Sequence, residues 1–390
     1  MTGRDCDIAI VGAGLAGGLI ALALRLRRPN LSVRVIEAGA APGGNHRWSW
    51  FASDLDGAGT ALMAPFAAAA WDDGYEVAFP GGRRHLPTGY RSLASADFAA
   101  ALARALPTML CHAPVEALAA DGVALANGER IGARAVIDAR GPVAAPQLTG
   151  GWQVFMGRHL RTARPHGLSR PLIMDAMVEQ RGGYRFVYVL PLGPDEVFVE
   201  DTYYQDSALL DAPALSARLD AYGHARGWDG EILGGETGVL PVITGGDFAA
   251  FQAAHRVPGV AVAGARGGFV HPLTSYTLPF AVTTALAIAA AADLPGERLA
   301  TLVETRARDL WHATRFYRRL GAMLFAAHPG ERRQVFERFY RLPVPLIERF
   351  YAGRSTVPDR ARILCGRPPL PLGRALGALT RAQPALGAAA

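Results

Sequence analysis

The amino-acid sequence predicts an α/β fold in which a Rossmann-type nucleotide-binding domain is joined to an antiparallel β-sheet domain and a helical C-terminal region. Three observations predict it. The first forty residues contain a strand, a glycine turn, a helix, a second strand and an acidic residue in succession. Residues 151–246 have the pattern of long β stretches with few helices, and the pattern becomes helical from residue 296. Because half of the 390 residues are hydrophobic, the chain can form a large core and more than one domain.

The nucleotide-binding unit begins with an apolar run at residues 7–11, which we expect to be a strand. A glycine turn follows at once, then an apolar-periodic helix from 19 to about 26, and a second strand at 33–36 that ends at Glu37. This order is typical of units that bind the ADP part of a dinucleotide. The turn residues expected to hold the nucleotide are Gly12, Ala13, Gly14, Leu15, Ala16 and Gly17.

Each part of this unit has a physical role. The three glycines allow a tight turn, a close approach of the backbone to a pyrophosphate, and packing of the helix on the strand. The helix N-terminus offers unpaired N–H groups and a positive dipole end to the phosphates. The Glu37 carboxylate can accept both ribose hydroxyls, and it disfavours a 2′-phosphate. The sequence therefore predicts FAD or NAD rather than NADP.

Three later segments favour FAD over NAD. A flexible turn at 39–44 follows Glu37, and in FAD enzymes such a turn often runs beside the flavin. A strand at 133–137 ends in a small-residue turn, which is how flavoproteins commonly close the Rossmann sheet. A short strand at 257–262 leads to a glycine-rich turn and a long helix from about Leu278, whose N-terminus can face the flavin. The cofactor-binding residues expected from these segments are Gly44, Arg140, Gly141, Gly264, Gly267 and Thr274.

The other expected elements divide the chain. A helix is expected at 95–106, and short strands at about 108–112, 115–118 and 123–126, with a hairpin turn at Asn127-Gly128. Antiparallel strands are expected at 152–161, 171–178, 184–190 and 196–204, before a helix at 211–223. The resulting division is the first part of the nucleotide-binding domain (1–75), the rest of that domain with room for a substrate-domain insertion (76–150), a β-sheet substrate domain (151–255), a return segment to the nucleotide-binding domain (256–295) and a helical region for which membrane docking is one of two interpretations (296–390).

The composition restricts location and partners. No uncharged apolar stretch of about eighteen residues is present, and no signal peptide precedes the first strand, so we expect a cytoplasmic protein. The three cysteines stand far apart and no HExxH spacing occurs, so neither a disulfide scaffold nor a metal site is expected. The net charge of +6 comes from arginine without lysine, which reflects either codon bias or a basic surface that faces anionic lipid. No basic stripe coincides with a binding motif, so no nucleic-acid partner is expected.

Arginines and aromatic residues alternate closely in the C-terminal region, at 315–319, 336–341 and 349–351. Two interpretations remain open. The helices could lie on a bilayer surface, which would make the membrane surface a partner. Alternatively, they form a helical cap whose aromatic side chains belong to the core and whose arginines are solvated.

Glu200 and Asp201 are the most informative residues outside the nucleotide-binding unit, since two adjacent carboxylates follow an apolar run on an expected strand. Side chains alternate across a strand, so the two acids face opposite sides and one of them points into the domain interior. A buried acid without a partner keeps its proton because desolvation raises its pKa, which makes it a candidate general acid. The alternative is two surface acids on an edge strand, and the apolar neighbours argue against it.

Several motifs occur together and in order between about residues 5 and 345. They are the glycine turn at 12–17, His46-x-Trp48-Ser49, the run at 184–192, Glu200-Asp201-Thr202-x-Tyr204, and His271-Pro272-x-Thr274-x-Tyr276. In this combination the chain resembles the bacterial lycopene β-cyclases, the flavoprotein type of carotenoid cyclase. The resemblance implies a glutathione-reductase-like FAD-binding Rossmann domain with the antiparallel substrate domain and helical region described above.

The resemblance further implies an enzyme that closes the ψ end groups of lycopene into β-ionone rings, through γ-carotene to β-carotene. The overall reaction is an isomerisation, yet the family requires reduced FAD, with NAD(P)H as the electron source. Glu200 would be the acid, matching the family's Glu-Asp-Thr motif, with Asp201 either supporting it or facing away. The base that removes the final proton stays open among Glu200, Asp201 and the flavin. Aromatic side chains that could bind substrate and stabilise a carbocation are Trp48, Tyr188, Tyr204 and Tyr276.

Lycopene dissolves only in bilayers, so the resemblance also implies peripheral association with the inner membrane. The expected partners are lycopene and other carotenoids, the membrane surface, and other enzymes of the carotenoid pathway. Two rival functions are a flavin-dependent monooxygenase, or another flavin oxidoreductase, acting on an apolar isoprenoid, and a non-enzymatic flavin- or lipid-binding protein at a membrane. Neither rival needs Glu200 for function. The choice between one-ring and two-ring products and the oligomeric state stay open.

Overall fold

The structure, a computed structural model, describes residues 4–365 and 384–387. Its first sheet contains six strands: β1 (Cys6–Val11), β2 (Val33–Ile36), β8 (Val115–Ala119), β9 (Gly122–Leu125), β10 (Arg130–Asp138) and β16 (Val260–Val262). Their order is β2-β1-β10-β9-β8, with β16 also paired to β10. Strand β1 is parallel to β2 and β10, and β16 is parallel to β10. This parallel arrangement is the Rossmann unit that the first forty residues predict.

Local sequence explains how this sheet is connected. Helix α1 (Leu15–Arg27) follows β1 and packs against α6 (Leu278–Ala290), and both helices are apolar on nearly every side because other elements bury them. The turn at Asn127-Gly128 joins β9 to β10 as predicted. The predicted strand at 108–112 is wrong. Only Leu110 pairs, with Ile36, because the chain turns at 107–108 and His112 has a φ of 53°.

The second sheet has eight strands: β5 (Tyr75–Phe79), β6 (Gly82–Leu86), β11 (Ala145–Thr162), β12 (Leu172–Asp175), β13 (Tyr184–Pro191), β14 (Glu196–Gln205), β15 (Gly230–Gly246) and β17 (Ala385–Leu386). Their order is β15-β11-β14-β13-β12-β5-β6, with β17 paired to β11. All pairs are antiparallel except β12 with β5. Helix α4 (Ala212–His224) covers one face of this sheet, where Leu219 and Tyr222 are buried. The opposite face packs against the C-terminal helices and borders the site described below.

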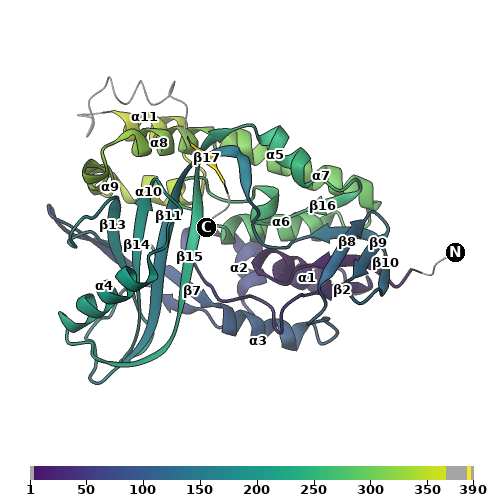
Figure 1. The fold of residues 1–390 in the computed structure, drawn as a ribbon, viewed down its shortest axis with the longest axis horizontal. Coiled ribbons are helices and arrows are strands. Elements are labelled where there is room, and N and C mark those ends of the chain that lie inside the picture. The colour runs from purple at the N-terminus through teal and green to yellow at the C-terminus, as the bar shows by residue number, and fades with distance from the viewer. Residues whose placement is uncertain (1–3, 366–383, 388–390) are drawn as a thin grey trace.

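The remaining elements connect and cover the two large sheets. A three-stranded sheet consists of β3 (Arg47–Phe51), β7 (Tyr90–Ala94) and β4 (Ala69–Trp71) in that order. The other helices are α2 (Gly57–Met63), α3 (Ser95–Ala105), α5 (Phe248–His255), α7 (Gly296–Ala313), α8 (Arg315–Ala326), α9 (Arg332–Phe339), α10 (Val344–Tyr351) and α11 (Val357–Leu364). Single turns of 3-10 helix occur at Ala52–Asp54, Ala265–Gly267 and Pro329–Glu331. In Figure 1 the Rossmann sheet lies to the right, the eight-stranded sheet to the left and α8 to α11 above it.

The burial of aromatic residues in the C-terminal helices distinguishes between the two interpretations of these residues. Tyr317, Tyr340, Phe350 and Tyr351 are buried in one hydrophobic core with strands of the eight-stranded sheet. These aromatic side chains therefore belong to a helical cap and are not a membrane-facing surface. Of the helical region predicted for 296–390, residues 366–383 and 388–390 lie outside the described residues. Within the described residues, no helix combines the length and the apolarity needed to cross a membrane.

Candidate active site

A cavity of about 690 Å³ lies between the Rossmann sheet and the face of the eight-stranded sheet opposite α4. Most of the predicted site residues line it: Gly12, Gly14, Leu15, Ala16, Glu37, Gly44, Trp48, Arg140, Gly141, Tyr188, Glu200, Tyr204, Gly264, Thr274 and Tyr276. Four predicted site residues do not line the cavity: Ala13, Gly17, Gly267 and Asp201. The cavity thus joins a nucleotide-binding end to a half that is lined by the sheet.

The three glycines of the first turn have different surroundings. Gly12 has a φ of 95°, and a β-carbon there would lie 2.8 Å from the carbonyl oxygen of Ala139. A β-carbon on Gly17 would lie 1.9 Å from the carbonyl oxygen of Gly12. At Gly14 no atom lies within 4 Å of the position that a β-carbon would occupy, and Gly14 lines the cavity. Gly12 and Gly17 therefore permit close packing within the protein, whereas Gly14 leaves room for a ligand.

Glu37 and Thr274 mark two positions at which a bound nucleotide cofactor would find polar partners. The Glu37 carboxylate accepts hydrogen bonds from the backbone N–H groups of Ala13, at 2.7 Å, and Gly39, at 2.8 Å, which fix it at the end of β2. Thr274 is buried in the cavity wall, and its hydroxyl has no hydrogen-bond partner among the described residues. A buried hydroxyl without a partner is costly, so this group is suited to bind a ligand.

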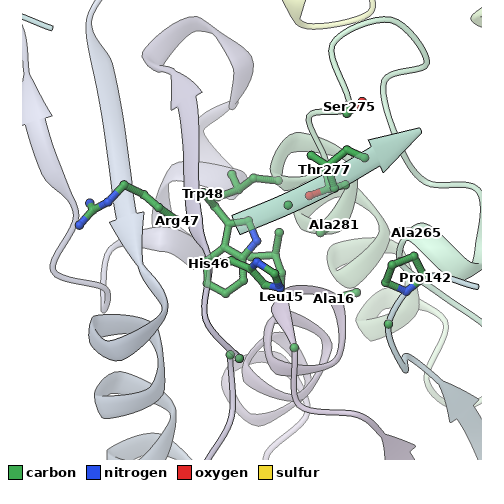
Figure 2. Close-up of a pocket in the computed structure, with 18 of the residues that line it drawn as sticks. Leu15, Ala16, His46, Arg47, Trp48, Pro142, Ala265, Ser275, Thr277 and Ala281 are labelled. Carbon is green, nitrogen blue, oxygen red and sulfur yellow. The ribbon is translucent and has the colours of Figure 1, made fainter. Parts of the chain in front are cut away.

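Two helices direct their N-termini at the cavity. Gly14 caps α1 and Thr277 caps α6, and neither helix has a side-chain cap on its first-turn N–H groups. Both capping residues line the cavity. Figure 2 shows Thr277, Leu15 and Ala281 at this part of its wall. Free N–H groups and positive dipole ends favour anionic ligands such as a pyrophosphate. The glycine turn, Glu37, Thr274 and the two helix ends fit an FAD molecule with its ADP part at α1.

Strand β3 borders the cavity with its consecutive residues Arg47, Trp48 and Ser49, and His46 before it also lines the cavity. Trp48 packs edge-on against Phe98, with 5.1 Å between ring centroids, and lies near His46. Figure 2 shows Arg47 pointing away from both of these residues. The Arg47 guanidinium lies over the ring of Phe198, 5.2 Å from its centroid, which brings this cation to the acidic part of the cavity. The sequence analysis did not single out Arg47.

Glu200 is the acid on β14 that faces the cavity. Its carboxylate accepts a hydrogen bond of 2.7 Å from the hydroxyl of Thr202, and within the described part of the chain it has no salt-bridge partner. Burial raises the pKa of Glu200 to about 7, with a further contribution from the charge of Asp201, while the Thr202 hydroxyl and Arg47 oppose the shift. A protonated carboxyl at neutral pH is therefore available inside the cavity.

Asp201 lies on the opposite face of the sheet and is 0% exposed. It accepts a hydrogen bond of 2.8 Å from Arg185 Nε and another of 3.2 Å from the hydroxyl of Tyr203. The Tyr203 hydroxyl in turn accepts a hydrogen bond of 2.6 Å from Arg218 of α4. The structure thus separates the two adjacent acids: Glu200 borders the cavity, and Asp201 forms a buried ion pair beneath α4.

The predicted aromatic residues are gathered around Glu200. Tyr188 lies directly opposite Glu200 on β13 and is hydrogen-bonded to Tyr90, whose hydroxyl is 3.1 Å from that of Tyr276. The Tyr204 hydroxyl donates to the carbonyl of Leu273 at 3.2 Å. Gln153 and Glu236 also line this part of the cavity, and neither was found by sequence reasoning. Both lie on strands of the sheet: Gln153 is paired with Tyr204, and Glu236 lies two strands from Glu200 across Gly157.

Solved structures show the class of protein to which this fold belongs. A flavoprotein/dehydrogenase from Cytophaga hutchinsonii superposes with a TM-score of 0.59 at 15% identity, over 92% of this chain and 95% of that one. A flavin-dependent brominase has a TM-score of 0.59 at 16% identity, over 89% of this chain and 93% of its own. The fold is therefore that of the flavoproteins with an FAD-binding Rossmann-type domain.

Sequence comparison narrows this class to a family. The family model described as "Lycopene cyclase protein" matches residues 7–377. A lycopene beta-cyclase of Pseudescherichia vulneris is 46% identical, over 95% of this chain and 96% of that protein. A lycopene beta-cyclase of a Paracoccus species is 44% identical, over 96% of this chain and 97% of that protein. The chain belongs to the lycopene cyclase family, as the motifs in its sequence predict.

Proposed function

We propose that this protein cyclises the ψ end groups of lycopene to β-ionone rings, giving γ-carotene and then β-carotene. The observation that carries the proposal is the Glu200 carboxyl, which faces an aromatic-lined cavity beside the nucleotide-binding turn and whose pKa is raised by burial to about 7. Its lycopene beta-cyclase relatives support the choice of substrate. The cavity has a nucleotide-binding end and a part that is lined by the sheet. Together these two parts support a polyene end group lying next to a flavin.

The reaction adds one proton and removes one for each ring. Glu200 donates its proton to C2 of the terminal C1=C2 double bond, and a tertiary cation forms at C1. The π electrons of C5=C6 form the C1–C6 bond, which moves the positive charge to C5. Loss of the proton at C6 then creates the new C5=C6 double bond. An alkene is a very weak base, so the acid must be held in place and the cation stabilised as it develops. The aromatic rings of Tyr188, Tyr204, Tyr276 and Trp48 are the groups proposed to do so.

We propose FAD as the resident cofactor, with its reduced form active and NAD(P)H as the reductant. The glycine turn at α1 would receive the pyrophosphate, Glu37 the ribose hydroxyls, and Thr274 and the N-terminus of α6 the flavin. When bound, a reduced anionic flavin supplies negative charge next to the developing cation without a net transfer of electrons. Gly44, Arg140, Gly141 and Gly264 are the remaining cavity residues assigned to the cofactor.

The assignment of Glu37 can be tested by binding. Glu37→Gln keeps the size of the side chain but removes the charge that can accept hydrogen bonds from ribose hydroxyls and from Ala13. We expect the Kd for FAD to rise by about tenfold or more, because a hydrogen bond to a charged group contributes about 1.5–3 kcal/mol. Flavin fluorescence titration of the apoprotein measures it. Glu129→Gln, an exposed acid in the β9–β10 turn, is the matched control, and equal Kd values for the two variants would contradict the assignment.

We also propose that the protein meets lycopene at the surface of the inner membrane. Lycopene is held in bilayers, and the net charge of +6 favours an anionic surface. Because the C-terminal aromatic side chains are buried, the support comes from helix α11, where Val357 is 76% exposed and Leu364 is 52% exposed, with Arg362 exposed between them.

Vesicle binding tests this docking proposal. We expect tighter binding to anionic than to neutral vesicles, and weaker binding as salt screens the charges. Val357→Ser combined with Leu364→Ser should weaken binding by about 100-fold or more, since each buried apolar side chain contributes about 1.5–3 kcal/mol when fully covered. Leu209→Ser, at a site that is 67% exposed elsewhere, is the control. Equal binding to both vesicle types, or an unchanged double variant, would argue against the proposal.

The experiment for the proposed function is incubation with lycopene in vesicles, FAD and NAD(P)H, followed by chromatography and mass spectrometry. A product of unchanged mass and shorter chromophore supports cyclisation. A product one oxygen heavier, or two hydrogens lighter, would instead support a monooxygenase or another flavin oxidoreductase.

A further inference from the structure

A second carboxyl faces the same cavity in register with Glu200. Gly157 of β11 pairs with Glu200 of β14 on one side and with Glu236 of β15 on the other. Residues directly opposite each other in antiparallel strands point to the same face, so Glu200 and Glu236 lie on one face two strands apart. At about 4.8 Å per strand, their backbones are about 10 Å apart, and glutamate side chains can converge over that distance. Gly157 itself has no side chain, and the ring of Phe198 fills the space above it.

The surroundings hold both carboxyls at the cavity. The loop before β3 is tied to β15 by a hydrogen bond of 3.0 Å from Asn45 Nδ2 to the carbonyl of Gly235, next to Glu236. The ring of Phe198 covers Gly157, and Arg47 lies over that ring. Among residues 4–365 and 384–387, neither Glu200 nor Glu236 forms a salt bridge. Two glutamates thus border an apolar cavity with one cation near them.

The charge balance favours one shared proton. Burial raises the pKa of Glu236, the charge of Glu200 raises it further, and the guanidinium and backbone N–H of Arg47 oppose the shift. Arg47 is itself close to Glu200 and Glu236, with Tyr188 and Asp97 as the other titratable groups that face it. Since the two carboxylates repel each other, the pair retains one proton near neutral pH. One member can then act as acid while the other acts as base.

We propose that Glu236 is the second catalytic carboxyl of this site, the base that removes the C6 proton after Glu200 has protonated C2. The proposal rests on the proposed function and names a base for its last step. Glu200 loses one proton to C2, and Glu236 gains the one released from C6, so each ring leaves the pair with the same number of protons. A proton transfer from Glu236 to Glu200 restores the starting state. No oxidant or reductant is consumed.

The position of the base determines the kind of ring. The cyclised C5 cation gives a β ring if the proton leaves C6, but a ring with a C4=C5 double bond if it leaves C4. A base fixed above C6 by β15 therefore explains a β-ring product. Its removal changes the type of ring as well as the rate. Ring type is a readout that a merely structural role of Glu236 would not alter.

The experiment compares Glu236→Gln and Glu236→Asp with wild type and with Glu231→Gln, an exposed acid on the same strand. Each holoenzyme is incubated with lycopene in D₂O, and product and recovered lycopene are analysed for ring type and deuterium. For Glu236→Gln we expect β-ring formation to fall about 10²-fold or more, as for loss of a general base. Rings with C4=C5 double bonds should appear, or deuterium should enter recovered lycopene, because Glu200 still protonates C2. Glu236→Asp should restore part of β-ring formation, and Glu231→Gln should match wild type.

Two results would overturn the proposal. One is β-ring formation by Glu236→Gln at the wild-type rate. The other is an FAD-loaded Glu236→Gln protein with an unchanged melting temperature that yields neither product nor deuterated lycopene. If Glu236→Gln does not fold, the Glu236→Asp variant tests the proposal. Its side chain is shorter by one methylene, so full activity would contradict the placement of the base at C6. A wild-type protein that leaves lycopene unchanged would instead refute the proposed function.

Discussion

Replacing Glu200 by glutamine is expected to lower the rate of cyclisation by about 10²–10⁴-fold, the usual contribution of a general acid. Glutamine fits the same space and can still accept the hydrogen bond of 2.7 Å from Thr202, but it has no proton to donate to C2. FAD binding and the melting temperature should stay close to wild type, since Glu200 has no salt-bridge partner in the described part of the chain. Lycopene consumption by the FAD-loaded variant measures the effect.

The matched control is Glu196→Gln, on the same strand and face but at the rim, where Glu196 pairs with Arg161 at 2.9 Å. It should keep wild-type activity.

For wild type, the acid form of Glu200 is present below a pKa of about 7, so activity should fall as pH rises above it. The neighbouring charges are Arg47, Asp201 and Glu236. An active Glu200→Gln protein would show that the proton comes from elsewhere.

Replacing Asp201 by alanine is expected to have the largest effect on stability, lowering the free energy of unfolding by about 3–5 kcal/mol. The change leaves the Arg185 guanidinium buried, with its side chain 8% exposed, and removes its hydrogen-bond acceptor at 2.8 Å. It also removes the acceptor of the Tyr203 hydroxyl. Denaturant-induced unfolding followed by circular dichroism measures the loss.

A second variant separates loss of the pair from loss of one partner. Asp201→Ala combined with Arg185→Leu removes both charges and should recover part of the stability, because an apolar pair avoids the cost of an unpaired buried charge. The Asp201→Ala variant also tests whether Asp201 has a structural role or a role in the chemistry. A fully folded, equally stable Asp201→Ala protein without activity would place Asp201 in the chemistry and contradict the structural role that its burial indicates.

The Rossmann unit was predictable because its signals are local. The spacing of Gly12, Gly14 and Gly17, with a strand before them and Glu37 after the next strand, defines a turn, a helix packing and a ligand contact within forty residues. Alternation along β14 also predicted that Glu200 and Asp201 point to opposite faces. Which of the two faced the cavity depended on α4, which covers one face of the sheet from a distant part of the chain.

Glu236 and Arg47 could not be found in the same way. Strand β15 contains four glycines before Val239, at 230, 234, 235 and 238, and two more at 245 and 246, which hide the alternating pattern of a strand. A β-carbon on Gly238 would lie 2.3 Å from the Phe155 ring, so at this position the glycine serves packing that only tertiary structure shows. The meeting of Glu236 with Glu200 is a property of strand register across β11, and sequence alone does not determine register.

In the proposed reaction, rings form by proton addition and proton loss, without net redox change. The most direct test is an anaerobic reaction in D₂O with lycopene and a limiting amount of prereduced FAD enzyme. We expect products in which each ring carries one deuterium, many rings formed per flavin, and a flavin that stays reduced. Flavin oxidised in proportion to the rings formed, or a product whose mass changes by anything other than deuterium, would contradict it.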